Sequence, residues 1–86
     1  MEPSQAIEDI RGKLKELAGD LADEVDGISD DDLLPATGVL DSAGLMELMV
    51  WYQDHFDIPL KQSEITIDNF GTLQRMADFA LSRVRG

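Results

Sequence analysis

The chain has 86 residues, no cysteine and a formal net charge of -11 at pH 7, and 43% of its residues are hydrophobic. This length predicts one small domain over residues 1–86, and the missing cysteines exclude disulfides and thiolate metal sites. The charge opposes binding to nucleic acid, and no apolar run is long enough for membrane insertion. Since the first residues do not resemble a signal peptide, we expect a cytoplasmic protein.

The first predicted element is an amphipathic helix from about Ser4 to about Ala18, with Gly19 as its stop signal. Its apolar residues recur at steps of three and four, which is the spacing of one helical face. These residues are Ile7, Ile10, Leu14, Leu17 and Leu21.

A long acidic connection follows, from about Asp20 to Leu40, and Gly27, Pro35 and Gly38 interrupt any helical pattern in it. A connection of this length is unusual in a compact domain, so either it has a functional reason or part of it is helical. Four apolar residues are expected to hold it against the core: Leu33, Leu34, Val39 and Leu40.

Acidic residues dominate the centre of the chain, with twelve from Glu16 onward before Lys61 supplies the next Lys or Arg. Such a surface favours basic patches on partner proteins, although acidity also keeps a small protein soluble. The aspartates at 30–32 lack the alternating oxygens, central glycine and closing glutamate of a calcium loop, so we predict no metal site.

The second helix is predicted from about Ser42 to Phe56, with Asp41 as its N-cap. Its apolar residues share one face: Leu45, Leu48, Met49, Tyr52 and Phe56. Ser42 therefore lies at a helix N-terminus, where free amide groups and the helix dipole favour a phosphate. The alternative is that Asp41 and Ser42 only cap the helix.

The outward face of this helix is expected to carry Ala43, Glu47, Val50 and Asp54, flanked by Met46 and Trp51. Apolar Met46 and Val50 beside the Glu47 carboxylate, within two turns of Ser42, are consistent with a docking patch. Single exposed apolar residues are also normal on any protein surface, so this pattern alone does not establish docking.

The last part of the chain predicts a loop, a short helical turn and a final helix. Pro59 ends the second helical region. Residues 65–67 fit a short strand, but we favour a loop that leads into a turn near Asp68 to Phe70. Thr72 is a suitable N-cap for the final helix, whose apolar residues are Leu73, Met76, Ala77, Ala80, Leu81 and Val84.

Three long amphipathic helices, one short helix and a long first loop predict a small all-α bundle. The only histidine, His55, is interpreted as a surface residue because no second member of a catalytic dyad stands near it in the sequence. With no metal-ligand pattern and no Gly-rich nucleotide loop, we predict no catalytic residues and no enzymatic activity.

The run Gly38-Val39-Leu40-Asp41-Ser42 before an apolar helix ending at Phe56 resembles the acyl carrier protein and peptidyl carrier protein superfamily, whose signature is Gly-x-x-Asp-Ser. The likeness continues through residues 56–60 and 65–73. It covers residues 38–81 well and the first 37 only by length and helical pattern. The resemblance implies an acyl-carrier-protein-like bundle and a single carrier domain over residues 1–86.

In this family the serine carries 4'-phosphopantetheine, so the resemblance implies that role for Ser42. A separate phosphopantetheinyl transferase would donate the group from coenzyme A, and its thiol would hold an acyl or aminoacyl group as a thioester. An adenylate-forming ligase would load the carrier, which we expect to be a monomer, and a downstream transferase would unload it. The second helix would then supply the partner-binding residues: Asp41, Ala43, Met46, Glu47 and Val50.

The cargo is less clearly indicated. Fatty-acid carriers usually have leucine and an acid after the serine, whereas this chain has Ala43 and Gly44. Asp-Ser-x-Gly is more similar to D-alanyl carriers and some free-standing aminoacyl carriers, and both acyl and aminoacyl cargo stay open. A different function also stays open, that of an acidic helical adaptor or inhibitor that binds a basic site on a partner without modification of Ser42.

Overall fold

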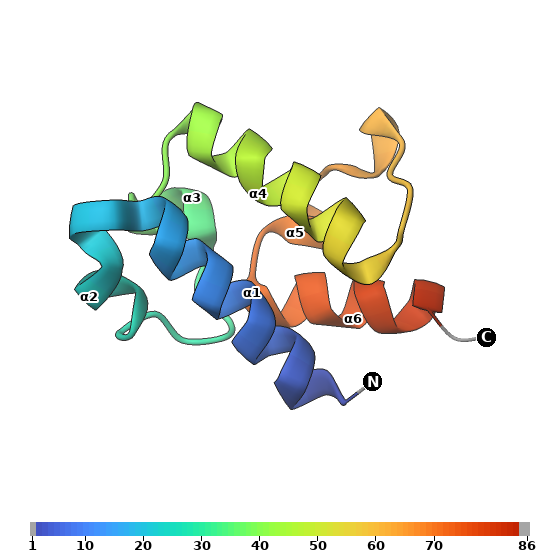
Figure 1. Ribbon diagram of the computed structural model, residues 1–86, viewed down its shortest axis with the longest axis horizontal. Helices are drawn as coiled ribbons and strands as arrows, with labels where there is room; N and C mark the ends of the chain where they lie inside the picture. The colour runs from blue at the N-terminus through green and yellow to red at the C-terminus, as the bar shows by residue number, and fades with distance from the viewer. Residues whose placement is uncertain (1, 85–86) are drawn as a thin grey trace.

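The computed structural model describes residues 2–84, and over this range it contains helices and connecting loops but no strand (Figure 1). The long helices are α1 (Pro3–Ala18), α4 (Ser42–Phe56) and α6 (Leu73–Val84). The short ones are α2 (Ala22–Val25), α3 (Leu34–Thr37) and α5 (Ile67–Phe70), with single 3-10 turns at Gly19–Leu21 and Gln62–Glu64. The predicted all-α bundle is confirmed.

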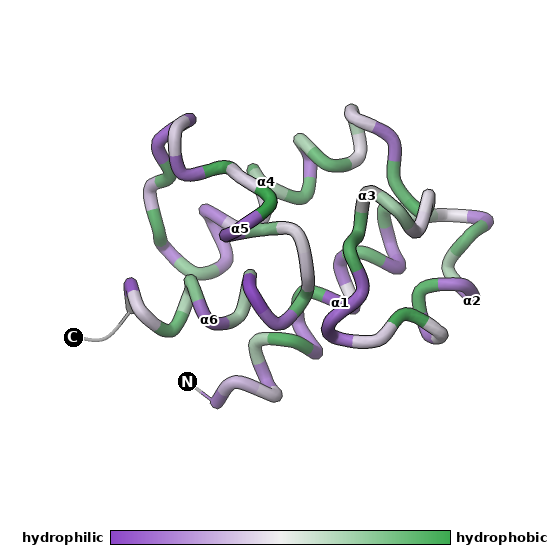
Figure 2. The backbone as a smooth tube through the Cα atoms, turned by 180° about the vertical axis from the view of Figure 1, so that it is seen from behind, coloured by the Kyte–Doolittle hydropathy of each residue, from purple (hydrophilic) through white to green (hydrophobic). Residues whose placement is uncertain are grey.

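The core lies where α1 packs against both α4 and α6. Figure 2 shows hydrophobic and hydrophilic stretches alternating along each long helix, as the spacing predicts. The buried side chains of these helices are Ala6, Ile10, Leu14, Leu48, Met49, Tyr52, Phe56, Leu73, Met76, Ala77 and Ala80. Leu21 was expected to continue the first apolar face. It lies in the 3-10 turn instead and is 38% exposed, because α1 has already ended at Ala18.

Tyr52 joins two of the long helices inside this core. Its side chain is fully buried, and its hydroxyl donates a hydrogen bond to the Met76 carbonyl oxygen of α6 at 2.7 Å. Its ring meets Phe56 and Phe70 edge to face, with centroids 4.9 and 5.2 Å away. Burial raises the pKa of the Tyr52 hydroxyl well above its ordinary value, since the phenolate would lose its hydration.

The connection between α1 and α4 is partly helical, which is one of the two explanations that we considered for its unusual length. Leu34 and Val39 are buried and Leu40 packs against the core, as predicted. Leu33, however, is 45% exposed, so its predicted burial is wrong. Leu33 is the extended residue before α3, and successive side chains in extended backbone point to opposite sides.

Two contacts that the sequence did not indicate fix this connection. Arg11 of α1 donates to the Val25 carbonyl oxygen at 2.6 Å and pairs with the Asp30 carboxylate at 3.0 Å. The Leu34 amide donates to the Gly71 carbonyl oxygen at 2.8 Å, which links α3 to the segment before α6. The acidic connection therefore runs along the bundle instead of extending away from it.

The segment between α4 and α6 follows the predicted loop, turn and helix. Thr66 caps α5 through the Asn69 amide, and Thr72 caps α6 through the Arg75 amide at 3.0 Å. Gly71 lies so close to α5 that an added Cβ would clash with the Ile67 carbonyl oxygen. The side chain of Val84 lies outside the described part of the structure. No helix within residues 2–84 has both the length and the hydrophobicity needed to cross a bilayer.

Candidate functional site

The N-terminus of α4 is capped as the sequence predicts. Asp41 is extended, and its Oδ1 accepts a hydrogen bond from the Gly44 amide at 2.8 Å. The Asp41 carbonyl oxygen accepts from the Leu45 amide at 2.9 Å, which begins the helical ladder. Ser42 is thus the first residue of a 15-residue helix, and its side chain is exposed.

Residues on both sides of Ser42 fix the position of this helix start. Gly38 ends α3 in the left-handed region with φ of 73°, which glycine adopts without strain. The next residue, Val39, is buried. Within the first turn, a Cβ on Gly44 would lie 3.1 Å from the Cδ2 atom of Leu40. A glycine at this position therefore allows Leu40 to pack closely beneath the start of α4. This structural reason for Gly44 was not predicted from the sequence.

The electrostatics of this helix start suit a covalently bound phosphate. The amides of the first turn have no partner within the helix, and the positive end of the helix dipole lies there. Within residues 2–84, the Ser42 hydroxyl donates no hydrogen bond to a side chain that could act as a base.

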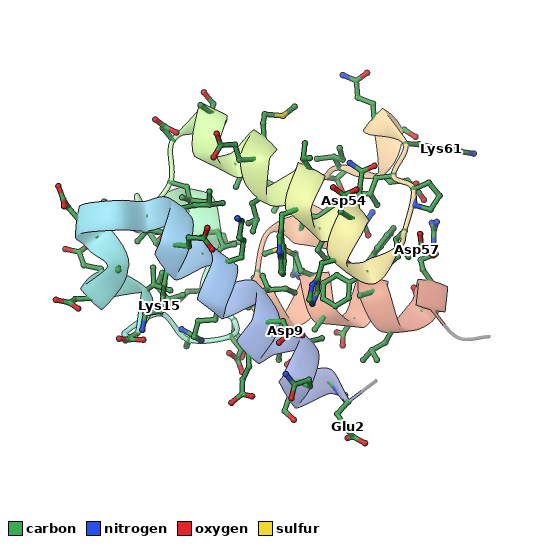
Figure 3. All side chains as sticks on the ribbon, viewed as in Figure 1. Glu2, Asp9, Lys15, Asp54, Asp57 and Lys61 are labelled. Carbon is green, nitrogen blue, oxygen red and sulfur yellow. The ribbon has the colours of Figure 1, made fainter. Side chains whose placement is uncertain are left out.

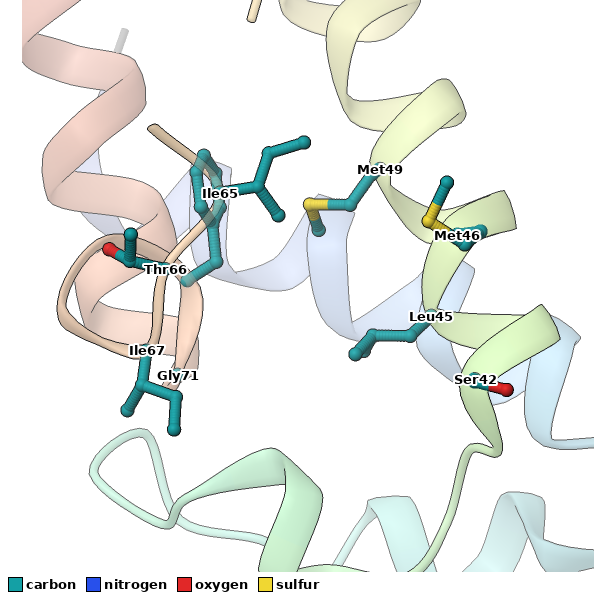
Figure 4. Close-up of a pocket in the computed structure, with 9 residues that line it drawn as sticks. Ser42, Leu45, Met46, Met49, Ile65, Thr66, Ile67 and Gly71 are labelled. Carbon is teal, nitrogen blue, oxygen red and sulfur yellow. The ribbon is translucent and has the colours of Figure 1, made fainter. Parts of the chain in front are cut away.

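An apolar pocket of about 270 Å³ opens beside Ser42, between α4 and the segment of residues 65–71. In Figure 4, Leu45 and Met49 point from α4 toward the opposite wall, where Ile65 faces Met49, and Ser42 stands at the rim with its hydroxyl turned away. The lining residues are Ser42, Leu45, Met46, Met49, Ile65, Thr66, Ile67, Phe70 and Gly71. The wall at residues 65–67 could not be predicted from a local pattern, because tertiary contacts bring it to α4.

The outward face of α4 is exposed as predicted. Met46 and Val50 are 62% and 56% exposed, and Ala43, Glu47 and Asp54 are exposed beside them. The partner-binding role predicted for Asp41, Ala43, Met46, Glu47 and Val50 stays a prediction. Asp41 caps α4, and the other four residues lie within about two turns of Ser42 along this helix.

His55 lies on the surface near the C-terminal end of α4, far along the helix from Ser42. Its Nε2 atom is 3.1 Å from an Asp9 carboxylate oxygen of α1, and its ring stacks on Trp51 with centroids 4.6 Å apart. This placement agrees with its interpretation as a surface residue. It contributes to the contact between α1 and α4 and not to the helix start that holds Ser42.

Comparison with known proteins agrees with this geometry. The phosphopantetheine attachment site family matches residues 8–80. D-alanyl carrier proteins of Streptococcus mutans and Streptococcus sanguinis are each 35% identical over 71 residues, which cover 81% of this chain and 89% of the relative. That of Streptococcus gordonii is 34% identical with the same coverage. No solved structure is a significant match.

The family match extends over most of the chain and includes α4 with its capped start, so it favours a carrier over the adaptor that the sequence alone left open. The exposed hydroxyl at a helix N-terminus fits the phosphodiester through which such a group is held. This chain therefore belongs to the phosphopantetheine attachment site family, and it is a carrier protein whose prosthetic group is 4'-phosphopantetheine.

Proposed function

We propose that Ser42 is the attachment residue and that the chain carries an amino acid, with D-alanine as the first candidate. The assignment of Ser42 as the attachment residue is supported by its exposed hydroxyl at the capped start of α4. Two other serines lie within the matched range of residues 8–80, Ser29 and Ser63. Ser29 lies in a loop and Ser63 in a single 3-10 turn, so neither begins a long helix.

The attached group supplies a thiol that holds the cargo as a thioester. In this proposal Ser42 provides the oxygen, and the first turn of α4 stabilises the phosphodiester charge. Asp41 has two roles: it caps the helix through Gly44, and its second carboxylate oxygen can orient the metal ion of the transferase. The exposed position of Ser42 leaves its hydroxyl accessible to that enzyme.

The small residues after Ser42 support the aminoacyl cargo. Ala43 and Gly44 replace the leucine and acid that fatty-acid carriers usually present at these positions, and Gly44 is in close contact with Leu40. Several relatives that match over most of the chain are D-alanyl carrier proteins. An amino acid activated by an adenylate-forming ligase is therefore the favoured load.

The partners implied are a phosphopantetheinyl transferase, the adenylate-forming ligase and a downstream transferase. These enzymes catalyse the loading and transfer reactions. We propose that the protein acts as a monomer in the cytoplasm, where an ATP-dependent ligase has its nucleotide. The acidic outward face of α4, with Asp41 and Glu47, would attract basic surfaces on these enzymes.

Intact-protein mass spectrometry tests the attachment residue. Wild type incubated with coenzyme A and a phosphopantetheinyl transferase should gain the mass of one phosphopantetheine, whereas Ser42→Ala should gain none. Ser63→Ala is the matched control, since it removes an exposed hydroxyl within the same family match, and it should be converted fully. A phosphopantetheine mass on Ser42→Ala would contradict the proposal.

The cargo is tested separately on the holo protein. With ATP and an adenylate-forming ligase that acts on D-alanine, we expect an adduct that hydroxylamine removes, as a thioester requires. Malonyl loading followed by elongation by fatty-acid enzymes, with no adduct from any amino acid, would exclude the aminoacyl cargo and leave the attachment residue unaffected.

A further inference from the structure

Among the methionines within residues 2–84, only Met46 is exposed to solvent. It is 62% exposed, whereas Met49 and Met76 are 4% and 0% exposed. In Figure 4 the Met49 sulfur reaches toward the opposite wall of the pocket, while the Met46 sulfur stays beside α4. A peroxide oxidises a thioether to a sulfoxide where it can reach the sulfur. Met46 is therefore the methionine in this part of the chain that an oxidant reaches first.

Met46 also lies between the two hollows that border α4. It lines the pocket of about 270 Å³ beside Ser42 and a second hollow of about 480 Å³ between α1 and α4, and it is the one residue that the two linings share. In Figure 3, Asp54 marks the α4 side of the second hollow. Ser42 lies four residues before Met46, so the two are neighbours on the helix surface. A chemical change at Met46 therefore takes place beside the proposed attachment residue.

We propose that Met46 is a site of reversible oxidation to the sulfoxide, with hydrogen peroxide as the oxidant. The thioether sulfur attacks one peroxide oxygen, so that a sulfur–oxygen bond forms and the oxygen–oxygen bond breaks. The proton of the transferred oxygen passes to the departing hydroxide, which leaves as water. Sulfur loses two electrons, and the peroxide gains them. Methionine sulfoxide reductases reverse this change, so the modification can act as a switch.

Oxidation at this position changes recognition and preserves the fold. The thioether is flexible and apolar, whereas the sulfoxide is polar and chiral. Because Met46 is outside the core, the new oxygen stays hydrated and costs the folded state little. An enzyme that covers the start of α4 has to remove that water, which weakens its contact with the carrier. This consequence rests on the proposed function: oxidation of Met46 slows the reactions in which an enzyme approaches Ser42.

The site of oxidation can be mapped on the full apo chain. The protein is treated with hydrogen peroxide for increasing times and digested with trypsin. No Lys or Arg lies between Lys15 and Lys61, so one tryptic peptide contains both Met46 and Met49. Tandem mass spectrometry then assigns each added oxygen, and Met76 is a second buried reference. We expect Met46 to react about tenfold faster than Met49 or Met76, in keeping with their exposure.

The consequence is measured as the rate at which a phosphopantetheinyl transferase converts the protein with coenzyme A. Wild type oxidised at Met46 should be converted about fivefold or more slowly than untreated wild type, and a methionine sulfoxide reductase should restore the rate. Met46→Leu keeps an apolar side chain that cannot be oxidised, so peroxide should not change its rate. Met46→Gln is polar at this position, so it should be slower than Met46→Leu without peroxide. Circular dichroism confirms that each form keeps its helices.

Oxidation of Met49 or Met76 as fast as Met46 would overturn the assignment of the site. Conversion of the oxidised wild type at the untreated rate would overturn the consequence, and so would equal slowing of wild type and Met46→Leu by peroxide. Failure of the proposed function is distinguishable from these outcomes, because the order of oxidation is measured on the apo protein. Untreated wild type that never gains phosphopantetheine would contradict the proposed function, while the oxidation map would still decide whether Met46 is the reactive methionine.

Discussion

The two faces of α4 differ in what their side chains contact. The inward face, with Leu48 and Tyr52, is buried against α1 and α6 and makes the aromatic and hydrogen-bonded contacts of the core. The outward face, with Ser42, Glu47 and Val50, is exposed and lines two hollows. One helix thus separates the residues that maintain the fold from those that can meet an enzyme. Substitutions on the two faces should affect different measurements.

The largest effect on stability is expected on the inward face. Leu48 is fully buried, so Leu48→Ala removes packed methyl groups and leaves a cavity, which should lower the free energy of unfolding by about 2–5 kcal/mol. Val50→Ala, two residues away on the outward face, should change it by less than about 0.5 kcal/mol. Urea unfolding followed by circular dichroism measures both. Equal losses for the two variants would mean that the two faces are not distinct.

The pH dependence of the free energy of unfolding tests the contribution of Tyr52 on the inward face. In the unfolded chain its hydroxyl titrates near its ordinary pKa of about 10, whereas burial raises the pKa in the folded state. The stabilising contribution is complete below the unfolded pKa and is lost as the pH rises toward the folded pKa. The free energy of unfolding should therefore fall above about pH 10, by as much as about 1.4 kcal/mol per pH unit.

Tyr52→Phe is the matched variant for this effect, because it keeps the ring and removes the group that titrates. It should lose about 1 kcal/mol near neutral pH, since the hydrogen bond to the Met76 carbonyl is absent. Above pH 10 its stability should fall less steeply than that of wild type. Identical slopes for the two proteins would show that other groups cause the alkaline loss.

On the outward face we expect changes in recognition without changes in stability. Glu47→Lys should slow loading by the partner ligase, since it replaces an exposed carboxylate with the opposite charge within two turns of Ser42. Added salt should slow the loading of wild type for the same reason and affect the variant less. Loading kinetics across a salt series measure both effects. The same rates for wild type and Glu47→Lys at every salt concentration would place the docking surface elsewhere.

The smallest expected effect on stability is that of Ser42→Ala. Asp41 and not Ser42 accepts the capping hydrogen bond from Gly44, so loss of the Ser42 hydroxyl should cost less than about 1 kcal/mol. Asp41→Ala is the comparison, because it removes that cap and should cost about 1 kcal/mol. Thermal unfolding followed by circular dichroism ranks the two. A larger loss for Ser42→Ala would assign the serine a structural role.

The long helices were predictable because each satisfies a local rule. Apolar spacing identified α1, α4 and α6, and the caps Asp41 and Thr72 identified two of their starts. The short helices in the connection were not predictable residue by residue. They depend on tertiary contacts, such as that of Arg11 with Val25 and that of Leu34 with Gly71, which no local pattern encodes.

The same distinction applies to the site. The position of Ser42 at a capped helix start was predictable because the signals for a helix start are local, whereas its role as the attachment residue stays a proposal. The pocket wall at residues 65–67 was not identified, since a segment far from α4 in the sequence forms it. The prediction that Leu33 is buried was wrong for a related reason. Leu33 and Leu34 are adjacent and equally apolar, and only the packing of α3 decides which of them turns inward.

The most direct test of the central claim is to locate the modification within the holo protein. After conversion with coenzyme A and a transferase, the protein is digested and its peptides are sequenced by tandem mass spectrometry. We expect phosphopantetheine on the peptide that contains Ser42, with the group assigned to that residue. Assignment of the group to Ser29, Ser63 or any other residue would contradict the claim that Ser42, at the exposed N-terminus of α4, is the attachment residue.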